Sequence, residues 1–123
     1  MTIHKNKSIV IFEQEPVRRI WSDKDEKWYF SVVDVIQALT DSRNPTDYLK
    51  KMRKRDRDLG FYLGTNCPQV KMIGSSGKKR KTLAGNVEQI LRLIQSIPSP
   101  KAEPFKLWLA KVVYERLKET VDP

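Results

Sequence analysis

The spacing of apolar residues changes at Ser31, and this change separates predicted strands from a predicted helix. Before it, three short runs of β-branched and aromatic residues (SIVIF, VRRIW and KWYF) are separated by Glu15-Pro16 and by the polar stretch SDKDEK. Such runs between turn signals are typical of a small β-meander. From Ser31, which forms a capping-box pattern with Asp34, apolar residues recur at the spacing of one helical face: Val32, Val35, Ile36 and Leu39.

A second helix is predicted over residues 45–58. Asn44 is a favoured N-cap, Pro45 is a favoured first helical residue, and Asp47 adds negative charge to the first turn. We expect Gly60 to end this helix and residues 61–68 to form a connecting loop.

The remaining chain predicts a hairpin and two more helices. Strand-like runs flank the turn sequence GSSG over residues 69–83, which indicates a β-hairpin. Asn86 caps the next helix, whose inner face is expected to hold Val87, Ile90, Leu91, Ile94 and Ile97. A final helix begins near Pro104, with its inner face at Phe105, Trp108, Leu109, Val112 and Val113.

These elements predict an α+β fold. It consists of an N-terminal β-meander, two helices, a basic β-hairpin and two C-terminal helices in one compact domain. We expect this domain to span residues 8–120, after a flexible tail of residues 1–7.

The length and composition of the chain exclude several classes of protein. Its 123 residues suit one domain, and 39% hydrophobic residues are enough to form a core. No apolar run approaches the length of a membrane-spanning helix or a signal-peptide core, so we expect a cytoplasmic protein without membrane contact. The single cysteine, Cys67, and the single histidine, His4, leave almost no ligands for zinc. We therefore expect no metal site and no cofactor.

No set of residues resembles catalytic machinery. Ser-His-Asp or Cys-His catalysis would need His4 as the base, and this residue lies in the predicted tail. The nearest acidic cluster falls in a tight polar turn, where solvated carboxylates are more common than a magnesium site: Asp23, Asp25 and Glu26. We therefore expect no catalytic residues and no enzymatic activity, and a metal-dependent nuclease is the weakest hypothesis.

The net charge of +9 is concentrated in one part of the chain. Residues 43–81 contain twelve Lys and Arg but only three Asp, a net charge of +9, whereas the charges elsewhere cancel. Two separate elements carry the excess, namely the run KKMRKRDR in the second helix and the basic residues of the hairpin. A charged helix face alone is often simply solvated, but two basic elements indicate a common anionic partner.

The stretch GSSGKKRKT at the hairpin has two interpretations. Glycines ahead of a lysine are found in phosphate-binding loops, which need G-x-x-x-x-G-K-[ST] between a strand and a helix. Here two residues separate the glycines, Lys78 precedes another lysine, and a strand-like run follows. The stretch therefore favours the tip of a hairpin over a nucleotide-binding loop.

Duplex DNA is the anionic partner that this pattern fits best. A helix fits the major groove, and a hairpin reaches a neighbouring groove or the backbone. Candidates for base contacts are Arg43, Asn44 and Lys50, although Asn44 has a competing role as the helix cap. The residues from Lys78 to Lys81 are candidates for phosphate contacts, which set affinity. The predicted DNA-binding set is Arg43, Asn44, Lys50, Lys51, Arg53, Lys54, Arg55, Arg57, Lys71, Lys78, Lys79, Arg80 and Lys81.

Two stretches of the chain resemble a known family, the amino-terminal domain of the Bro proteins. Residues 26–55 combine an aromatic strand, a V-x-D-V helix around Asp34 and a second helix opened by Asn44-Pro45. Residues 95–119 are similar to bacterial Bro-type proteins in which IPSPKAEPF leads into a W-L-A helix, some of them like DNA-damage-inducible protein D. The resemblance covers roughly residues 8–120.

The resemblance implies a small α+β DNA-binding domain acting in prophage or transcriptional regulation, as in prophage antirepressors. Many relatives continue into a second, helical region, so the chain resembles one domain of a longer protein. The family supplies no catalytic residues to transfer to this sequence.

Two hypotheses on function follow. In the first, a non-enzymatic module contacts duplex DNA through the helix at 45–58 and the hairpin at 69–83. In the second, the same basic surface binds an acidic face of a protein partner, a repressor or a recombinase, with little direct binding to DNA. The sequence leaves the oligomeric state and the target site open.

Overall fold

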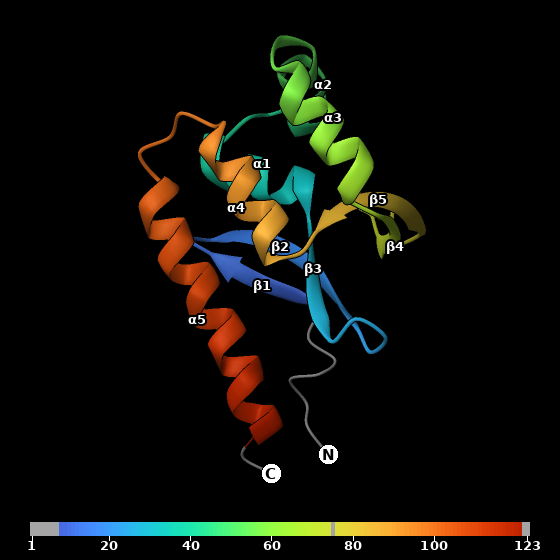
Figure 1. Ribbon diagram of the computed structural model, residues 1–123, viewed down its shortest axis with the longest axis vertical. Helices are drawn as coiled ribbons and strands as arrows, with labels where there is room; N and C mark the ends of the chain where they lie inside the picture. Colours follow the sequence, from blue (N-terminus) through green and yellow to red (C-terminus); the bar gives the residue numbers. More distant parts are fainter. Residues whose placement is uncertain (1–7, 75, 122–123) are drawn as a thin grey trace.

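A curled antiparallel sheet forms the centre of the fold (Figure 1). The computed structural model describes residues 8–74 and 76–121, with side chains up to Val113, so the predicted tail of residues 1–7 lies outside the described residues. Within them, five strands are arranged in the order β1-β2-β3-β5-β4. They are β1 (Ile9–Phe12), β2 (Glu15–Ser22), β3 (Lys27–Ser31), β4 (Gln69–Ile73) and β5 (Lys79–Gly85). The predicted meander and the predicted hairpin are both confirmed.

Five helices of the described chain complete the α+β fold, which confirms the predicted fold class. They are α1 (Val32–Thr40), α2 (Pro45–Arg55), α3 (Arg57–Asn66), α4 (Val87–Gln95) and α5 (Ala102–Val121). The core between sheet and helices includes the fully buried side chains of Phe30, Ile36, Ile90 and Phe105. The ring of Phe12 stands edge-on to that of Phe105, with centroids 4.9 Å apart, and this contact joins β1 to α5.

The prediction of one helix over residues 45–58 and a loop over 61–68 is wrong. The backbone of Asp56 is extended, with φ −117° and ψ 94°, and its carboxylate accepts a hydrogen bond from the Leu59 N–H. Asp56 therefore ends α2 and caps a new helix, α3, which continues through most of the predicted loop. Gly60 does not end a helix but lies inside α3. A glycine suits this position because it lies close to the α2 backbone: a Cβ there would lie 3.0 Å from the Arg53 carbonyl oxygen.

Two smaller differences concern turns and burial. The first β-turn is formed by Glu13 and Gln14, whose φ values of 46° and 75° are those of a tight hairpin turn, and Pro16 pairs with Ile11 inside β2. On α4, Leu93 is fully buried, whereas Leu91 was expected on the inner face but is 36% exposed. On α5, the predicted inner residues Phe105, Leu109 and Val112 are buried, and Trp108 and Val113 are half-buried.

Candidate nucleic-acid interface

The side chain of Arg18 connects three parts of the fold. Its guanidinium donates to both carboxylate oxygens of Asp34 in α1, from Nε to Oδ2 at 2.8 Å and from Nη2 to Oδ1 at 2.9 Å. Its Nη1 donates to the carbonyl oxygen of Ile73 at the end of β4, at 3.1 Å. The hydrogen bond to Asp34 raises the pKa of Arg18 above its ordinary value. Arg18 thus joins the meander and α1 to the hairpin.

The second helix forms one side of a groove. Its N-cap is Asn44, whose side-chain oxygen accepts from the Asp47 N–H at 3.0 Å, and Leu49 and Met52 anchor it in the core. Pro45, Thr46, Leu49 and Arg53 line the groove and share one helical face. Arg53 is held there by α3, because its Nη2 donates to the Gly60 carbonyl oxygen at 3.4 Å.

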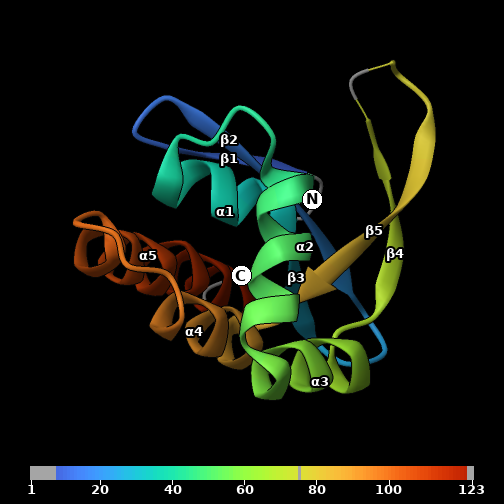
Figure 2. The ribbon, with the colours of Figure 1, turned by 90° about the horizontal axis from the view of Figure 1, so that it is seen from above.

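The hairpin forms the other side of this groove. Seen from above, it extends beyond the rest of the sheet (Figure 2), and its residues line the groove together with those of α2. Its turn is closed by hydrogen bonds between Gly74 and Lys78 and between Gly77 and Gly74, with Gly77 at φ +84°, while Ser75 of the predicted turn lies outside the described residues. Arg80 and Lys81 on β5 and Ile73 on β4 line the groove.

The groove has a volume of about 790 Å³ and brings the two basic elements together. Arg53 from α2 and Arg80 and Lys81 from β5 line it, although 27 positions separate Arg53 from Arg80 in the sequence. Arg18 and Asp34 also line it, and their ion pair balances their charges. An adjoining hollow of about 560 Å³ on α2 shares Arg53 with the groove and adds Asn44 and Lys50.

The predicted binding residues differ in their positions relative to the groove. Those that line it or the adjoining hollow are Asn44, Lys50, Arg53, Arg80 and Lys81. Lys51 and Arg55 lie about 200° and 240° around α2 from Leu49, on the far side of the helix from the groove. Lys51 forms an ion pair with Asp47, with 3.1 Å between Nζ and Oδ2. The other predicted residues are exposed outside the groove lining: Arg43, Lys54, Arg57, Lys71, Lys78 and Lys79.

Cross-strand pairing places three lysines on one face of the hairpin. Lys71 lies directly opposite Lys81, and Ile73 lies opposite Lys79, so these residues share one side of the two strands. Like charges directly opposite each other destabilise a strand pair. The hairpin therefore carries a repulsive cluster that an anion would relieve.

Sequence reasoning did not identify Arg18 as part of this region. Arg18 lies in a predicted strand next to a second arginine, and only the three-dimensional fold shows that it meets Asp34 and Ile73. The capping-box pattern of Ser31 and Asp34 identified Asp34, the partner of Arg18, but only as a residue of the helix cap. Ser31 Oγ accepts from the Asp34 N–H as predicted, and the Asp34 carboxylate accepts from Arg18.

Two other features are absent from the part of the chain that the structure describes. No group of three or more His, Cys, Asp or Glu in this part of the chain is arranged to hold a metal ion. No described helix has the length and apolar composition to cross a membrane.

Burial raises the pKa of the Cys67 thiol to about 11, and the charge of Arg53 opposes this shift.

Comparison with protein families identifies the domain. The N-terminal domain of the BRO family, Bro-N, matches residues 16–115 of the 123-residue chain. Searches of curated proteins and of solved structures return no match. The match spans β2 to α5, and so includes the Arg18–Asp34 pair, α2 and the whole hairpin. The chain therefore belongs to the BRO family and carries its N-terminal domain.

Proposed function

We propose that this domain is a non-enzymatic DNA-binding module, and that the groove between α2 and the β4–β5 hairpin holds the phosphate backbone of duplex DNA. The observation that carries the proposal is the position of Arg53 opposite Arg80 and Lys81 across one groove. Cations on two sides of a groove suit a polyanionic strand that passes between them.

The charges of these residues are available to a ligand. Within the described residues, the ion pairs involve other cations, and none of Arg53, Arg80 and Lys81 forms one with a carboxylate. The carboxylate that lines the groove, Asp34, is already paired with Arg18. A phosphate entering the groove therefore meets uncompensated positive charge.

The lysine cluster on the hairpin adds a second reason. The opposed pair of Lys71 and Lys81 is unfavourable in the free protein, and a bound phosphate would reduce the repulsion between the two ammonium groups. An unfavourable arrangement of this kind is expected where stability has been traded for binding.

Membership in the Bro-N family supports a regulatory role. The family is associated with prophage antirepressor-like proteins. We infer that DNA binding by this domain serves prophage or transcriptional regulation, including the response to DNA damage suggested by the likeness of residues 95–119. In this role the chain acts inside the bacterial cytoplasm.

A salt titration of DNA binding tests the proposal. Fluorescence anisotropy with a labelled 20-base-pair duplex should give a plot of log K against log salt with a slope of about −5, because some six basic side chains meet phosphates. Arg53, Arg80 and Lys81 line the groove, Lys50 lines the adjoining hollow, and Lys71 and Lys79 share the hairpin face that carries Lys81. A slope shallower than about −1 would contradict the proposal.

Two double variants with the same change of charge distinguish the groove from general basicity. Arg80→Gln with Lys81→Gln should weaken binding at least tenfold and make the slope shallower by about 2. Lys51→Gln with Arg55→Gln, on the far side of α2, should change the slope by less than about 0.5. Equal losses in both variants would show that net charge, and not the groove, governs binding.

The alternative hypothesis gives a different result in the same assay. If the basic groove binds an acidic face of a repressor or recombinase, the anisotropy of the labelled duplex should not rise at tens of micromolar protein in about 0.1 M salt. The Arg80 and Lys81 double variant would then lose the protein partner instead.

A further inference from the structure

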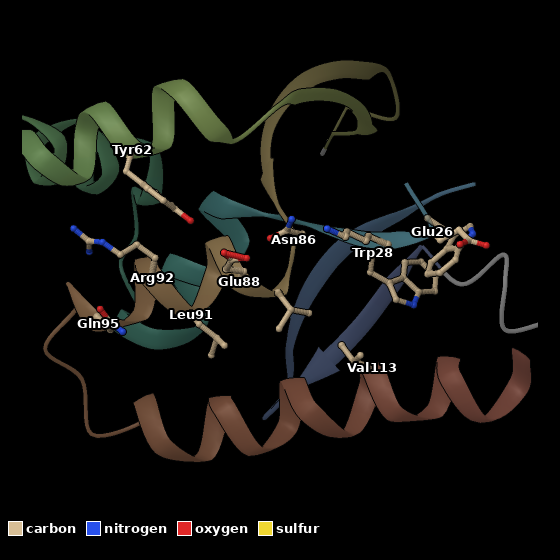
Figure 3. A pocket seen from close by; sticks show the side chains of 12 residues that line it. Glu26, Trp28, Tyr62, Asn86, Glu88, Leu91, Arg92, Gln95 and Val113 are labelled. Atoms are coloured by element: carbon tan, nitrogen blue, oxygen red, sulfur yellow. The ribbon is translucent and has the colours of Figure 1, made fainter. Parts of the chain in front are cut away.

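A second cavity, of about 680 Å³, has none of its described lining residues in common with the groove. Figure 3 shows it as an open space bounded by α4, by α5 and by the sheet, with Tyr62 and Arg92 at one end and Trp28 and Glu26 at the other. Its volume lies in the range of sites that enclose small organic molecules.

Aromatic and aliphatic side chains dominate the surface of this cavity. The rings belong to Trp21, Trp28 and Tyr62, and the aliphatic side chains to Val87, Leu91 and Val113. Planar ring systems pack well against such faces and edges. The cavity therefore favours a flat aromatic ligand over a flexible polar one.

The charged groups of the described residues that line the cavity cancel. Glu26 and Glu88 supply two negative charges, and Lys27 and Arg92 supply two positive ones. The Arg92 guanidinium is also engaged, because it donates to Ser96 Oγ at 2.8 Å and lies over the Tyr62 ring. Unlike the groove, the described lining of this cavity has no net charge to select an anion or a cation, so an uncharged ligand suits it.

One buried donor at the cavity lacks a partner. Trp28 is 4% exposed, and within the described residues its indole Nε1 is buried without a hydrogen-bond acceptor. The neighbouring Trp21 differs, because its Nε1 donates to Asp23 at 3.0 Å. An unpaired buried N–H is unfavourable, so a ligand that displaces the Trp28 ring slightly and offers this N–H an acceptor atom would be stabilised.

Leu91 supports the same conclusion. It belongs to the apolar pattern of α4 that predicts a buried face, yet it is 36% exposed and lines the cavity. A ligand in the cavity would cover this side chain, as the core covers Leu93.

We propose that the cavity between α4, α5 and the β2–β3 strands binds an uncharged planar aromatic molecule that carries a hydrogen-bond acceptor. The proposal does not depend on DNA binding. Quinoline is a suitable probe, because it is a flat two-ring compound whose ring nitrogen accepts a hydrogen bond and is uncharged at pH 7.5.

Nuclear magnetic resonance of the ¹⁵N-labelled protein tests the proposal through its three tryptophans, Trp21, Trp28 and Trp108. Titration with quinoline should shift the indole N–H signals of Trp21 and Trp28 and leave that of Trp108, which does not line the cavity. The Trp28 signal should move downfield as its N–H gains an acceptor. Half-saturation is expected at roughly 0.1–1 mM for a ligand of about ten non-hydrogen atoms.

Two leucines provide a matched pair of variants. Leu91→Arg places a charge in the cavity and should weaken quinoline binding at least tenfold, whereas Leu107→Arg, at an exposed position of α5 outside the cavity lining, should bind as the parent protein does. If Leu91→Arg fails to fold, Leu91→Trp fills the cavity with an apolar ring and should block binding equally. Absence of a saturable shift up to 5 mM, equal shifts at Trp108, or unchanged binding in both Leu91 variants would overturn the proposal.

Discussion

The guanidinium of Arg18 and the carboxylate of Asp34 face each other in a two-point ion pair, with N–O distances of 2.8 and 2.9 Å. Asp34 also accepts from the Arg18 backbone N–H at 2.9 Å, so this one carboxylate receives three donors of the same residue. Both side chains are largely shielded from water, with exposed fractions of 22% and 14%. The pair therefore fixes the start of α1 against β2 more firmly than a surface ion pair could.

Replacing Asp34 tests this pair. Asp34→Asn removes the charge but keeps the size of the side chain, and we expect it to lower the free energy of unfolding by about 2 kcal/mol, because a part-buried guanidinium loses its counter-charge. Urea denaturation followed by circular dichroism measures the change. Asp23→Asn, in the exposed β2–β3 turn, retains the acceptor for Trp21 and should change stability by less than about 0.5 kcal/mol.

The opposed lysines on the hairpin predict opposite effects on stability and binding. Lys71→Thr removes the repulsion with Lys81 and places a β-branched residue in a strand, so it should stabilise the fold by about 0.5 kcal/mol. The same change should weaken DNA binding and make the salt slope shallower by about 1. Lys24→Thr, in an exposed turn, removes the same charge and serves as the control. It should change neither the stability of the fold nor the binding of DNA. A Lys71 variant that lost stability would show that the repulsion is negligible.

Two glycines of α3 should respond differently to alanine. A Cβ at Gly60 would lie 3.0 Å from the Arg53 carbonyl oxygen, so Gly60→Ala forces α2 and α3 apart and should cost about 1–3 kcal/mol. A Cβ at Gly64 meets only the end of the Arg53 side chain, at 3.2 Å, which can move. Gly64→Ala should therefore be neutral or stabilise α3 by up to about 1 kcal/mol. Thermal unfolding of both variants checks the difference, and similar losses would contradict the close contact at Gly60.

Asn44 offers a test of its two predicted roles. Because its side-chain oxygen accepts from the Asp47 N–H, Asn44→Ala should cost about 1 kcal/mol of stability, and Asn44→Ser, which keeps a capping oxygen, should restore most of it. Binding measured on duplexes that differ in their A·T content should show the same preference for all three proteins. A change of preference in Asn44→Ser, with stability retained, would instead indicate a base contact.

Cys67 predicts a dependence on pH. Its pKa is raised to about 11 in the folded chain from an ordinary value of 9.0, so the folded state keeps its proton over an interval in which the unfolded state loses it. The contribution of this thiol to stability is therefore complete below pH 9 and is lost as the pH rises towards 11. At pH 8 the folded protein should contain about 100-fold less thiolate than the urea-unfolded protein and react with iodoacetamide correspondingly more slowly. If the rate of iodoacetamide reaction with the folded protein levelled off near pH 9, the raised pKa of Cys67 would be contradicted.

Most elements of the fold could be predicted from local patterns. The strands, α1 and α4 have strong caps or clear alternation, and these signals depend only on neighbouring residues. The break at Asp56 could not be predicted in this way, because the charged run around it continues the helical pattern on both sides. Gly60 misled the prediction for a related reason: a glycine that permits close packing of two helices has the same appearance in a sequence as a glycine that ends one.

The candidate site could be predicted only in part. Charge counting identified α2 and the hairpin as basic, but it treated every cation on the helix alike. The structure separates Arg53, which lines the groove, from Arg55, which lies on the far side, because rotation about the helix axis is fixed by the burial of Leu49 and Met52. The contribution of Arg18 depends on contacts over 16 and 55 positions, which no local pattern contains.

The hairpin is attached to the rest of the sheet at few points. Only Phe30–Gly85 and Ser31–Ala84 pair β5 with β3 in the described sheet, and beyond them Arg18 holds the end of β4. The helix on the other side of the groove, α2, is anchored in the core by Leu49 and Met52. We therefore expect the hairpin to act as a hinged arm that bends between Leu83 and Ala84, where β5 passes from β4 to β3, while α2 keeps its position against the core.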